Sequence, residues 1–265
     1  MATFRLLRQT NRSSRFAQVT VEVAASSRSE VEVTAIAAEE HRREAELGAR
    51  WALRGLPAAA KVTVTDVVIT EVDTSTGDVY EATARAVRRA LRVEHRAPYA
   101  GFSDPEMVAS WLKNMFGRRL DAVTEARHWY QGRREPDAES LLHAWLFFEY
   151  AVPVGLHGRG DQLLLAKEDP YRSYDMDECG EARVGPAQPP DVLSGFIGAL
   201  LTDGAVIVGH DGDAVCAGLV LRFGNRDLVI GTLGDEWVLA VGSVPAPAAQ
   251  YGALQPFLRG ADRSG

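Results

Sequence analysis

The side chains best suited to bind a ligand lie close to the amino terminus. Arg8, Arg12 and Arg15 precede the first acidic residue, Glu22, so this stretch of the chain is locally basic. Guanidinium groups on a polar loop can contact the phosphates of a nucleic acid without reading its sequence. The alternative is an ordinary solvated loop whose arginines hold no ligand.

A second polar loop, residues 69–75, joins the end of a predicted strand to the start of a helix. If the strands that carry the two loops are neighbours, both loops lie at one end of the same sheet. Arg12 and Arg15 then lie beside the amide groups of a helix N-terminus, which attract anions. In this hypothesis the arginines contact phosphate while Asp73 and Ser75 hold the second loop.

Hydrophobic patterning predicts the elements that position these loops. Strict alternation over 17–23 indicates a strand, and a stripe of small residues indicates a helix that ends before Pro57. A capping box at 75–78 precedes apolar residues at helical spacing. Together the patterns predict strands at 17–23 and 31–33, a helix at 38–54, a strand at 62–72 and a helix from 78 to 91. This order, β-β-α-β-α, is a compact unit of the α+β class.

The charge distribution indicates a second domain. Residues 1–95 carry 14 basic and 13 acidic side chains, whereas the other 170 residues carry 15 and 23, which accounts for the net charge of −7. Such asymmetry suggests two modules with different partners. We therefore expect a first domain at 1–95, a linker at 96–102, an α+β domain with an antiparallel sheet at 103–245 and a flexible tail at 246–265.

Patterning in the second domain predicts both helices and strands. Residues 103–106 combine a capping box with an early proline, which indicates the start of a helix. The turn Gly224-Asn225 separates two alternating runs, which indicates a hairpin. The other expected elements are a strand at 143–152 paired with 162–167 across a turn at 157–161, a helix at 189–201, hairpin strands at 217–223 and 228–230, and a third strand at 236–241.

The two loop-bearing stretches resemble a known family. Residues 8–23 are similar to the start of domain IV of the translational GTPase elongation factor G, which has a basic Gln-containing loop, an aromatic residue and an alternating strand. Residues 68–84 resemble a later pattern of that domain, in which a strand leads into Val-Asp-Ser-Ser and then a helix. Here the motif is Val-Asp-Thr-Ser at 72–75, with Tyr80 at the family's aromatic position. The resemblance covers residues 5–92, about a third of the chain.

The resemblance implies a fold and a partner. In that family the domain has the α+β fold of small-subunit ribosomal proteins, and its tip enters the decoding centre of the ribosome. Carried over by position, residues Asn11 to Arg15 form the first tip loop and Thr70 to Ser75 the second. The family's tip glycines and tip histidine are replaced here, by Asn11, Ser13, Ser14 and Thr70. No GTPase domain is recognisable, so the resemblance implies binding without motor activity.

Other motifs give little indication of chemistry. The chain has no phosphate-binding loop, no dinucleotide fingerprint and no nucleophile elbow. Asp175 and Asp177 begin a calcium-like spacing, but Cys179 and Pro186 occupy positions that need oxygen ligands. We therefore expect no cofactor and no metal.

An enzyme remains the least supported hypothesis. Its groups would be His157, Asp161, Asp169 and Asp175, and it requires that the fold gather them in a pocket. Cys216 begins an alternating strand, which predicts packing rather than nucleophilic chemistry. Trp111, Trp129, Trp145 and Trp237 are expected to be core anchors.

Composition is typical of a globular cytoplasmic protein, with 46% hydrophobic and 25% charged residues. No apolar run approaches the ~20 residues that cross a bilayer, and the first fifteen residues lack the apolar segment of a secretory signal. We predict a non-catalytic protein that binds ribosomes or ribosomal RNA through its N-terminal tip, while its acidic second domain contacts a protein and neither contacts a membrane. The alternative is a protein-interaction or immunity-like module in which the resemblance is of fold only.

Overall fold

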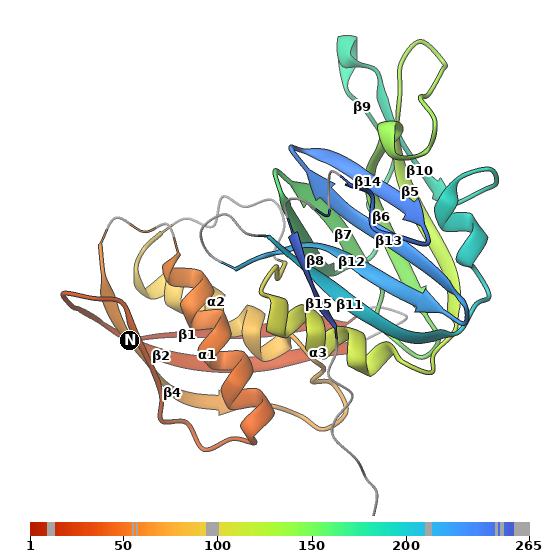
Figure 1. Ribbon diagram of the computed structural model, residues 1–265. Coiled ribbons are helices and arrows are strands. Elements are labelled where there is room, and N and C mark those ends of the chain that lie inside the picture. The colour runs from red at the N-terminus through yellow and green to blue at the C-terminus, as the bar shows by residue number, and fades with distance from the viewer. Residues whose placement is uncertain are drawn as a thin grey trace, which may run out of the picture. The chain divides into compact units, whose positions relative to one another are not determined.

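The computed structural model describes residues 1–9, 14–54, 56, 58–93, 101–209, 214–246, 249 and 252–256 (Figure 1). The protein is α+β, as the sequence predicts, with antiparallel pairing dominant in its sheets. Its internal contacts divide it into two compact units, Met1–Phe102 and Ser103–Gly265. The ring of Phe102 packs against Tyr80 in the first unit, with 6.2 Å between the ring centroids. In the described ranges, no helix is long and apolar enough to cross a membrane.

The first unit contains a four-stranded sheet and two helices. The strand order is β1-β2-β4-β3, and only the β3–β4 pair is parallel. The elements are β1 (Ala2–Gln9), β2 (Ser14–Ala25), β3 (Glu30–Val33), α1 (Glu39–Leu53), β4 (Ala60–Val68) and α2 (Asp78–Ala90). The predicted order therefore gains one strand, β1. In the sequence, apolar Phe4 and Leu6 alternate with polar Thr3 and Arg5, but the next outward residue, Leu7, is apolar and exposed. This apolar residue interrupts the polar–apolar pattern, so the sequence does not indicate β1.

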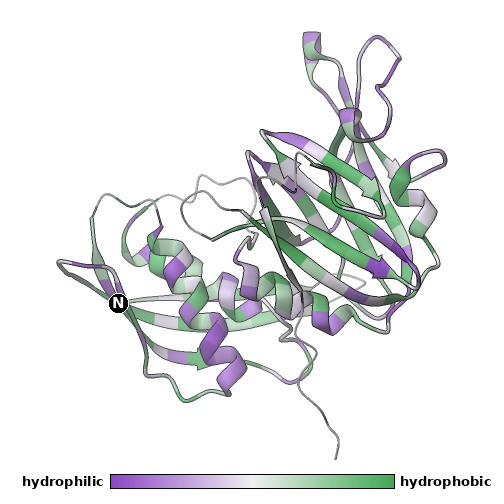
Figure 2. Ribbon diagram, in the orientation of Figure 1, coloured by the Kyte–Doolittle hydropathy of each residue, from purple (hydrophilic) through white to green (hydrophobic). Residues whose placement is uncertain are grey.

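Both helices cover one face of this sheet (Figure 1). Apart from Phe4 and Leu6 of β1, the inward residues of the strands are β-branched or small, and they form one core with the small residues of α1. At Gly48 the two helices approach so closely that a Cβ atom would lie 2.4 Å from the carbonyl oxygen of Tyr80. The outward side of α1 is hydrophilic (Figure 2). The opposite face of the sheet carries the exposed side chains of Thr3, Arg5 and Leu7.

The second unit contains two antiparallel sheets and the helix α3 (Pro105–Met115). The larger sheet has the order β8-β7-β6-β5-β10-β9, with β5 (Leu120–Trp129), β6 (Leu141–Phe148), β7 (Val154–Arg159), β8 (Gln162–Lys167), β9 (Tyr174–Asp175) and β10 (Glu181–Pro186). The smaller has the order β14-β13-β12-β11-β15, with β11 (Leu201–Gly209), β12 (Cys216–Phe223), β13 (Arg226–Leu233), β14 (Glu236–Val241) and β15 (Gly252–Pro256). Short 3₁₀ helices lie at Asp137–Ser140 (η1), Asp177–Cys179 (η2) and Val192–Phe196 (η3).

Aromatic side chains join the elements of the second unit. The ring of Phe148 on β6 stacks on Phe223 of β12, with 6.5 Å between the centroids. Trp111 of α3 packs edge-on against Phe148 at 6.1 Å. Trp111 and Trp145 are fully buried, as the sequence predicts, whereas Trp129 and Trp237 are only partly buried. Most large buried side chains of this unit are therefore shared between the two sheets and α3.

The structure confirms some predicted elements of the second unit. The hairpin β12–β13 turns at Gly224-Asn225, and β14 has the bounds that alternation predicts. The helix α3 begins where the sequence predicts, although its capping residue is Asp104, whose carboxylate accepts hydrogen bonds from the N–H groups of Glu106 and Met107.

Other predictions for this unit are wrong. The helix expected at 189–201 is only η3, because Gly195 and Gly198 interrupt it and Gly198 has a positive φ of 85°. The strand β6 pairs with β7 rather than β8, because residues 157–159 extend β7 instead of forming a turn. Residues 252–256 of the expected tail form β15, which pairs with β11.

Candidate functional site

The strands that flank the two predicted tip loops are neighbours, and residues 10–13 of the first loop lie outside the described residues. In the register, Gln18 of β2 lies opposite Val68 of β4. The backbone N–H of Phe16 donates a hydrogen bond to the carbonyl oxygen of Asp73 at 2.9 Å. The hydroxyl of Thr74 donates to the carbonyl oxygen of Phe16 at 2.6 Å. The expectation that the two strands are neighbours is therefore confirmed, and the second loop contacts the start of β2.

The second loop is closed by its own hydrogen bonds. The N–H of Thr70 donates to the hydroxyl of Thr74 at 3.0 Å, and the N–H of Asp73 donates to the hydroxyl of Thr70 at 3.2 Å. Ser75 donates from its N–H and its hydroxyl to Oδ2 of Asp78, at 2.8 and 3.1 Å. Ser75 thus anchors this loop through its own polar groups, whereas Asp73 contacts Phe16 through its backbone carbonyl.

The N-terminus of α2 already holds carboxylates of the protein itself. Glu44 of α1 accepts hydrogen bonds from the N–H groups of Gly77 at 2.8 Å and Tyr80 at 3.4 Å. Asp78, which is fully buried, accepts from Ser75. The helix end attracts anions, as expected, but these two side chains satisfy that preference. The predicted phosphate site beside this helix end is therefore corrected to an internal carboxylate site.

Arg15 is part of that internal site. Its side chain is 5% exposed, its Nε donates to Oδ1 of Asp78 at 2.8 Å, and its Nη2 donates to Oε2 of Glu81 at 2.7 Å. Burial alone lowers the pKa of Arg15, but the charges of Glu81 and Asp78 outweigh it, so the pKa is raised. Arg15 therefore joins β2 to α2 and does not face solvent as the phosphate hypothesis requires. The sequence held the signal, because Arg15 is in phase with Ala17 and the other buried residues of β2.

The other predicted tip residues have different placements. Arg8 lies in β1, opposite Arg15 in the register, rather than in a loop. Asn11 and Arg12 lie outside the described residues. Thr70 is exposed at the start of the second loop.

An exposed patch remains beside these loops, on the sheet face opposite the helices. We call it the open-face patch: Arg5, Leu7, Phe16, Gln18 and Val68. The register places Leu7 opposite Phe16, and it places Arg5, Gln18 and Val68 in one row across three strands. The guanidinium of Arg5 lies 5.3 Å from the centroid of the Phe16 ring, and Leu7 is 67% exposed. A guanidinium with an aromatic ring suits phosphate and base contacts in single-stranded nucleic acid.

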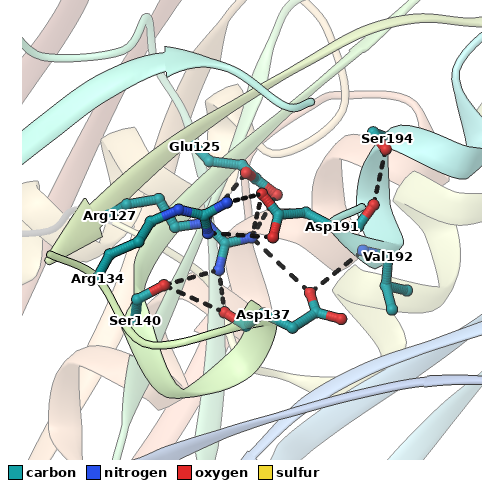
Figure 3. A network of polar contacts seen from close by, with 8 residues as sticks. All are labelled: Glu125, Arg127, Arg134, Asp137, Ser140, Asp191, Val192 and Ser194. Atoms are coloured by element: carbon teal, nitrogen blue, oxygen red, sulfur yellow. Dashed lines mark hydrogen bonds and ion pairs between the residues drawn. The ribbon is translucent and has the colours of Figure 1, made fainter. Parts of the chain in front are cut away.

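A buried ionic network lies in the second unit (Figure 3). Arg127 of β5 is 5% exposed and donates two hydrogen bonds to the carboxylate of Glu125, at 2.8 and 3.0 Å. Arg134 donates two more to Asp191, at 3.0 and 2.8 Å. Arg127 also donates to Ser140 and to the backbone oxygen of Asp137, which ties β5 to η1.

This network is structural rather than catalytic. Two guanidinium groups face three carboxylates, and each carboxylate already has a protein partner. Burial raises the pKa of Glu125, and the hydrogen bond and charge of Arg127 partly offset this rise. The negative charges of Asp191 and Asp137 raise the pKa further. Because the cations and hydrogen bonds are all directed inward, the arrangement stabilises the link between β5, η1 and η3.

A histidine cluster is the group that sequence analysis missed. His143 of β6 and His157 of β7 are opposite each other in the register, with 4.5 Å between the ring centroids. Nε2 of His157 lies 2.6 Å from Oε1 of Glu168, and Nδ1 of His143 lies 2.5 Å from the hydroxyl of Tyr171. Burial, with the neighbouring His157, lowers the pKa of His143 to about 3. His143 is therefore neutral at physiological pH.

The structure does not gather the groups of the enzyme hypothesis. His157 is paired with Glu168, while Asp175 lies on β9, at the other edge of the sheet. Asp161 accepts a hydrogen bond from the N–H of Gly234 in another hairpin. Within the described ranges, no three His, Cys, Asp or Glu side chains are arranged to hold a metal ion. Burial raises the pKa of Cys216 to about 12, which is consistent with packing.

The chain matches no known protein-family model and no curated protein sequence.

Replacing Arg15 with Met should destabilise the first unit. The change leaves Asp78 and Glu81 without the guanidinium, so we expect the free energy of unfolding to fall by about 3–5 kcal/mol. Arg50→Met is the matched control, because Arg50 forms an exposed pair with Glu46, and its loss costs about 0.5 kcal/mol or less. Urea denaturation followed by circular dichroism measures both. Equal effects of the two changes would contradict the role given to Arg15.

Arg127→Met should destabilise the second unit by about 3–5 kcal/mol, because it strands the buried carboxylate of Glu125. The double variant Glu125→Met/Arg127→Met should recover part of that loss, since it removes the stranded charge as well. Arg222→Met, which removes an exposed pair with Asp227, serves as control. Urea titration gives the comparison. A double variant no more stable than Arg127→Met would refute the buried-charge explanation.

Acid should destabilise the fold through His143. The unfolded histidine takes up a proton near pH 6.5, whereas the folded one does so only near pH 3, so its contribution is complete above pH 6.5 and is lost as the pH falls. Between pH 7.5 and 4.5 this linkage amounts to about 2–3 kcal/mol. Urea denaturation at both pH values should show a smaller loss in His143→Gln than in the wild type. An equal loss would show that other groups control acid stability.

Proposed function

We propose that the chain is a non-catalytic binding protein that contacts ribosomal RNA through the loop end of its first unit. The observation that carries this proposal is the open-face patch, in which Arg5 lies over Phe16, and Phe16 is hydrogen-bonded to the loop at residues 70–75. A ribosomal partner would place the protein in the cytoplasm.

The chemistry of the patch supports a nucleic-acid partner. Arginine contacts phosphates through charge and stacks on bases through its planar face, and an adjacent aromatic ring adds a second stacking surface. The sequence adds Arg8 and Arg12 on the same hairpin, before the first acidic residue. In this proposal Arg5 and Arg12 contact phosphate, while Arg15 holds the scaffold that presents them.

The resemblance to domain IV of elongation factor G supports the same end of the unit. That domain contacts the ribosome through the loops that correspond to residues 11–15 and 70–75. In this chain Arg15 directly precedes Phe16 of the open-face patch, and the N–H of Phe16 donates a hydrogen bond to Asp73 in the second segment. The ribosomal-protein type of fold and the two-domain arrangement belong to this proposal, as does binding without a GTPase.

A protein partner is the second candidate, because apolar side chains are exposed at the same end. Val72, in the second loop, is 92% exposed, and Leu7 is 67% exposed. Exposed apolar groups of this kind often mark a protein interface. The acidic balance of the second unit also suits a basic protein surface. In this candidate the resemblance to elongation factor G is of fold only.

Sedimentation with ribosomes tests the proposal. The wild-type protein should pellet with ribosomes at about 50 mM salt and be released as salt rises, because phosphate contacts release counterions. Arg5→Gln/Arg12→Gln should bind about tenfold or more weakly and depend less on salt. Arg42→Gln/Arg50→Gln removes two exposed arginines from α1 and should bind like the wild type.

Two outcomes would overturn this proposal. Failure of the wild type to pellet at low salt would exclude ribosome binding. Loss of binding in Val72→Ser, with Arg5→Gln/Arg12→Gln unaffected, would indicate an apolar protein contact instead. Treatment of the ribosomes with nuclease then shows whether the protein binds ribosomal RNA or ribosomal protein, because only RNA binding is lost.

A further inference from the structure

A pocket in the second unit belongs neither to the ionic network nor to the histidine cluster. Its volume is about 450 Å³, and it lies where the β7–β8 turn meets the end of the β13–β14 hairpin. Strands β11 and β12 complete its wall. Pockets of this size hold small molecules, and their few polar groups fix the orientation of the ligand.

Two strands approach closely at one wall of the pocket. Gly231 of β13 lies opposite Gly218 of β12, so no side chain fills this part of the sheet face. A Cβ atom at Gly231 would lie 2.7 Å from the carbonyl oxygen of Ala217, so a larger residue would require the strands to shift. Ile207, Val229 and Val238 supply apolar side chains to the same pocket. The floor therefore suits an apolar group.

The rim is held by hydrogen bonds between two turns. Oδ1 of Asp161 accepts from the N–H of Gly234 at 2.6 Å. The carboxylate of Asp235 accepts from the N–H of Gly160, and the N–H of Asp235 donates to the carbonyl oxygen of Gly160 at 3.2 Å. Each carboxylate thus has one oxygen fixed by a backbone amide. The rim is positioned before any ligand arrives, which reduces the entropic cost of binding.

Charges of both signs surround the rim. Arg159 is exposed and makes no ion pair with any residue that the structure describes. Thr232 lines the pocket and is 4% exposed, and its hydroxyl has no hydrogen-bond partner in the described part of the chain. Its oxygen is buried from solvent, so Thr232 adds to the wall of the pocket and not to its polar rim.

From this arrangement we propose that the pocket binds an apolar α-amino acid. The ligand's carboxylate pairs with Arg159, its ammonium group pairs with Asp161 and Asp235, and its side chain lies on the apolar floor. A guanidinium is suited to a carboxylate because it donates two parallel hydrogen bonds. A ligand with only one of the two charges leaves part of the rim without a counter-charge. The proposal is independent of RNA binding by the first unit.

Isothermal titration calorimetry on the full chain tests this proposal with three probes of similar size. L-Phenylalanine carries both charges, 3-phenylpropionate lacks the ammonium group, and phenethylamine lacks the carboxylate. We expect L-phenylalanine to bind about tenfold or more tightly than either analogue. Equal affinity for all three probes, tighter binding of an analogue, or no binding of L-phenylalanine or L-leucine would overturn the proposal.

Matched variants assign the two head groups. Arg159→Gln should weaken L-phenylalanine about tenfold and leave phenethylamine unchanged. Asp161→Asn and Asp235→Asn keep a side-chain oxygen for the turn amides but remove a charge, so they should weaken L-phenylalanine and spare 3-phenylpropionate. Ala217→Leu should fill the pocket and abolish binding, while circular dichroism verifies that it folds. Unchanged affinity of the Arg159→Gln variant would refute the assigned orientation.

Discussion

A single buried guanidinium determines the geometry of the first unit. Arg15 is charged and almost fully buried. Separating it from Asp78 and Glu81 would leave an uncompensated buried charge, which strongly destabilises the fold. Those partners lie in the first turn of α2, so the ion pairs fix that helix end against β2. The same Asp78 holds Ser75, and the loop before it hydrogen-bonds to Phe16. The position of the tip loops thus depends on one cation inside the unit.

This constraint also decides which surfaces remain for a partner. The helix N-terminus and the arginine nearest to it would together form a good anion site, but Glu44 and Asp78 are the anions that occupy it. In the proposed function, binding uses the sheet face away from the helices, where Arg5 is exposed and lies over the partly buried ring of Phe16. Phosphate contacts of the proposed kind would then be made on this sheet face and not at the helix end, and a sheet face suits stacking better than enclosure.

Sequence patterns predicted the strands and turns that can be recognised from a few consecutive residues. Alternation located β2, β12 and β14, and the Gly224-Asn225 turn located a hairpin. The strand β1 and the short η3 escaped because exposed Leu7 and interrupting glycines disguise them. The pairing of His157 with Glu168 depends on how β6, β7 and β8 align, which no local pattern contains. Arg15 was predictable from its phase, because strand alternation places it on the buried face.

Carboxylates of the second unit are held in two different ways, and the difference shows where charge remains for a ligand. In the ionic network Glu125 and Asp191 each accept two hydrogen bonds from an arginine, so no cation is left for a ligand. At the pocket rim Asp161 and Asp235 are bonded to backbone amides instead, which satisfies one oxygen but neutralises no charge. Arg159 is not used by either carboxylate. Positive and negative charges therefore stay separate there, and a zwitterion is the ligand that satisfies both.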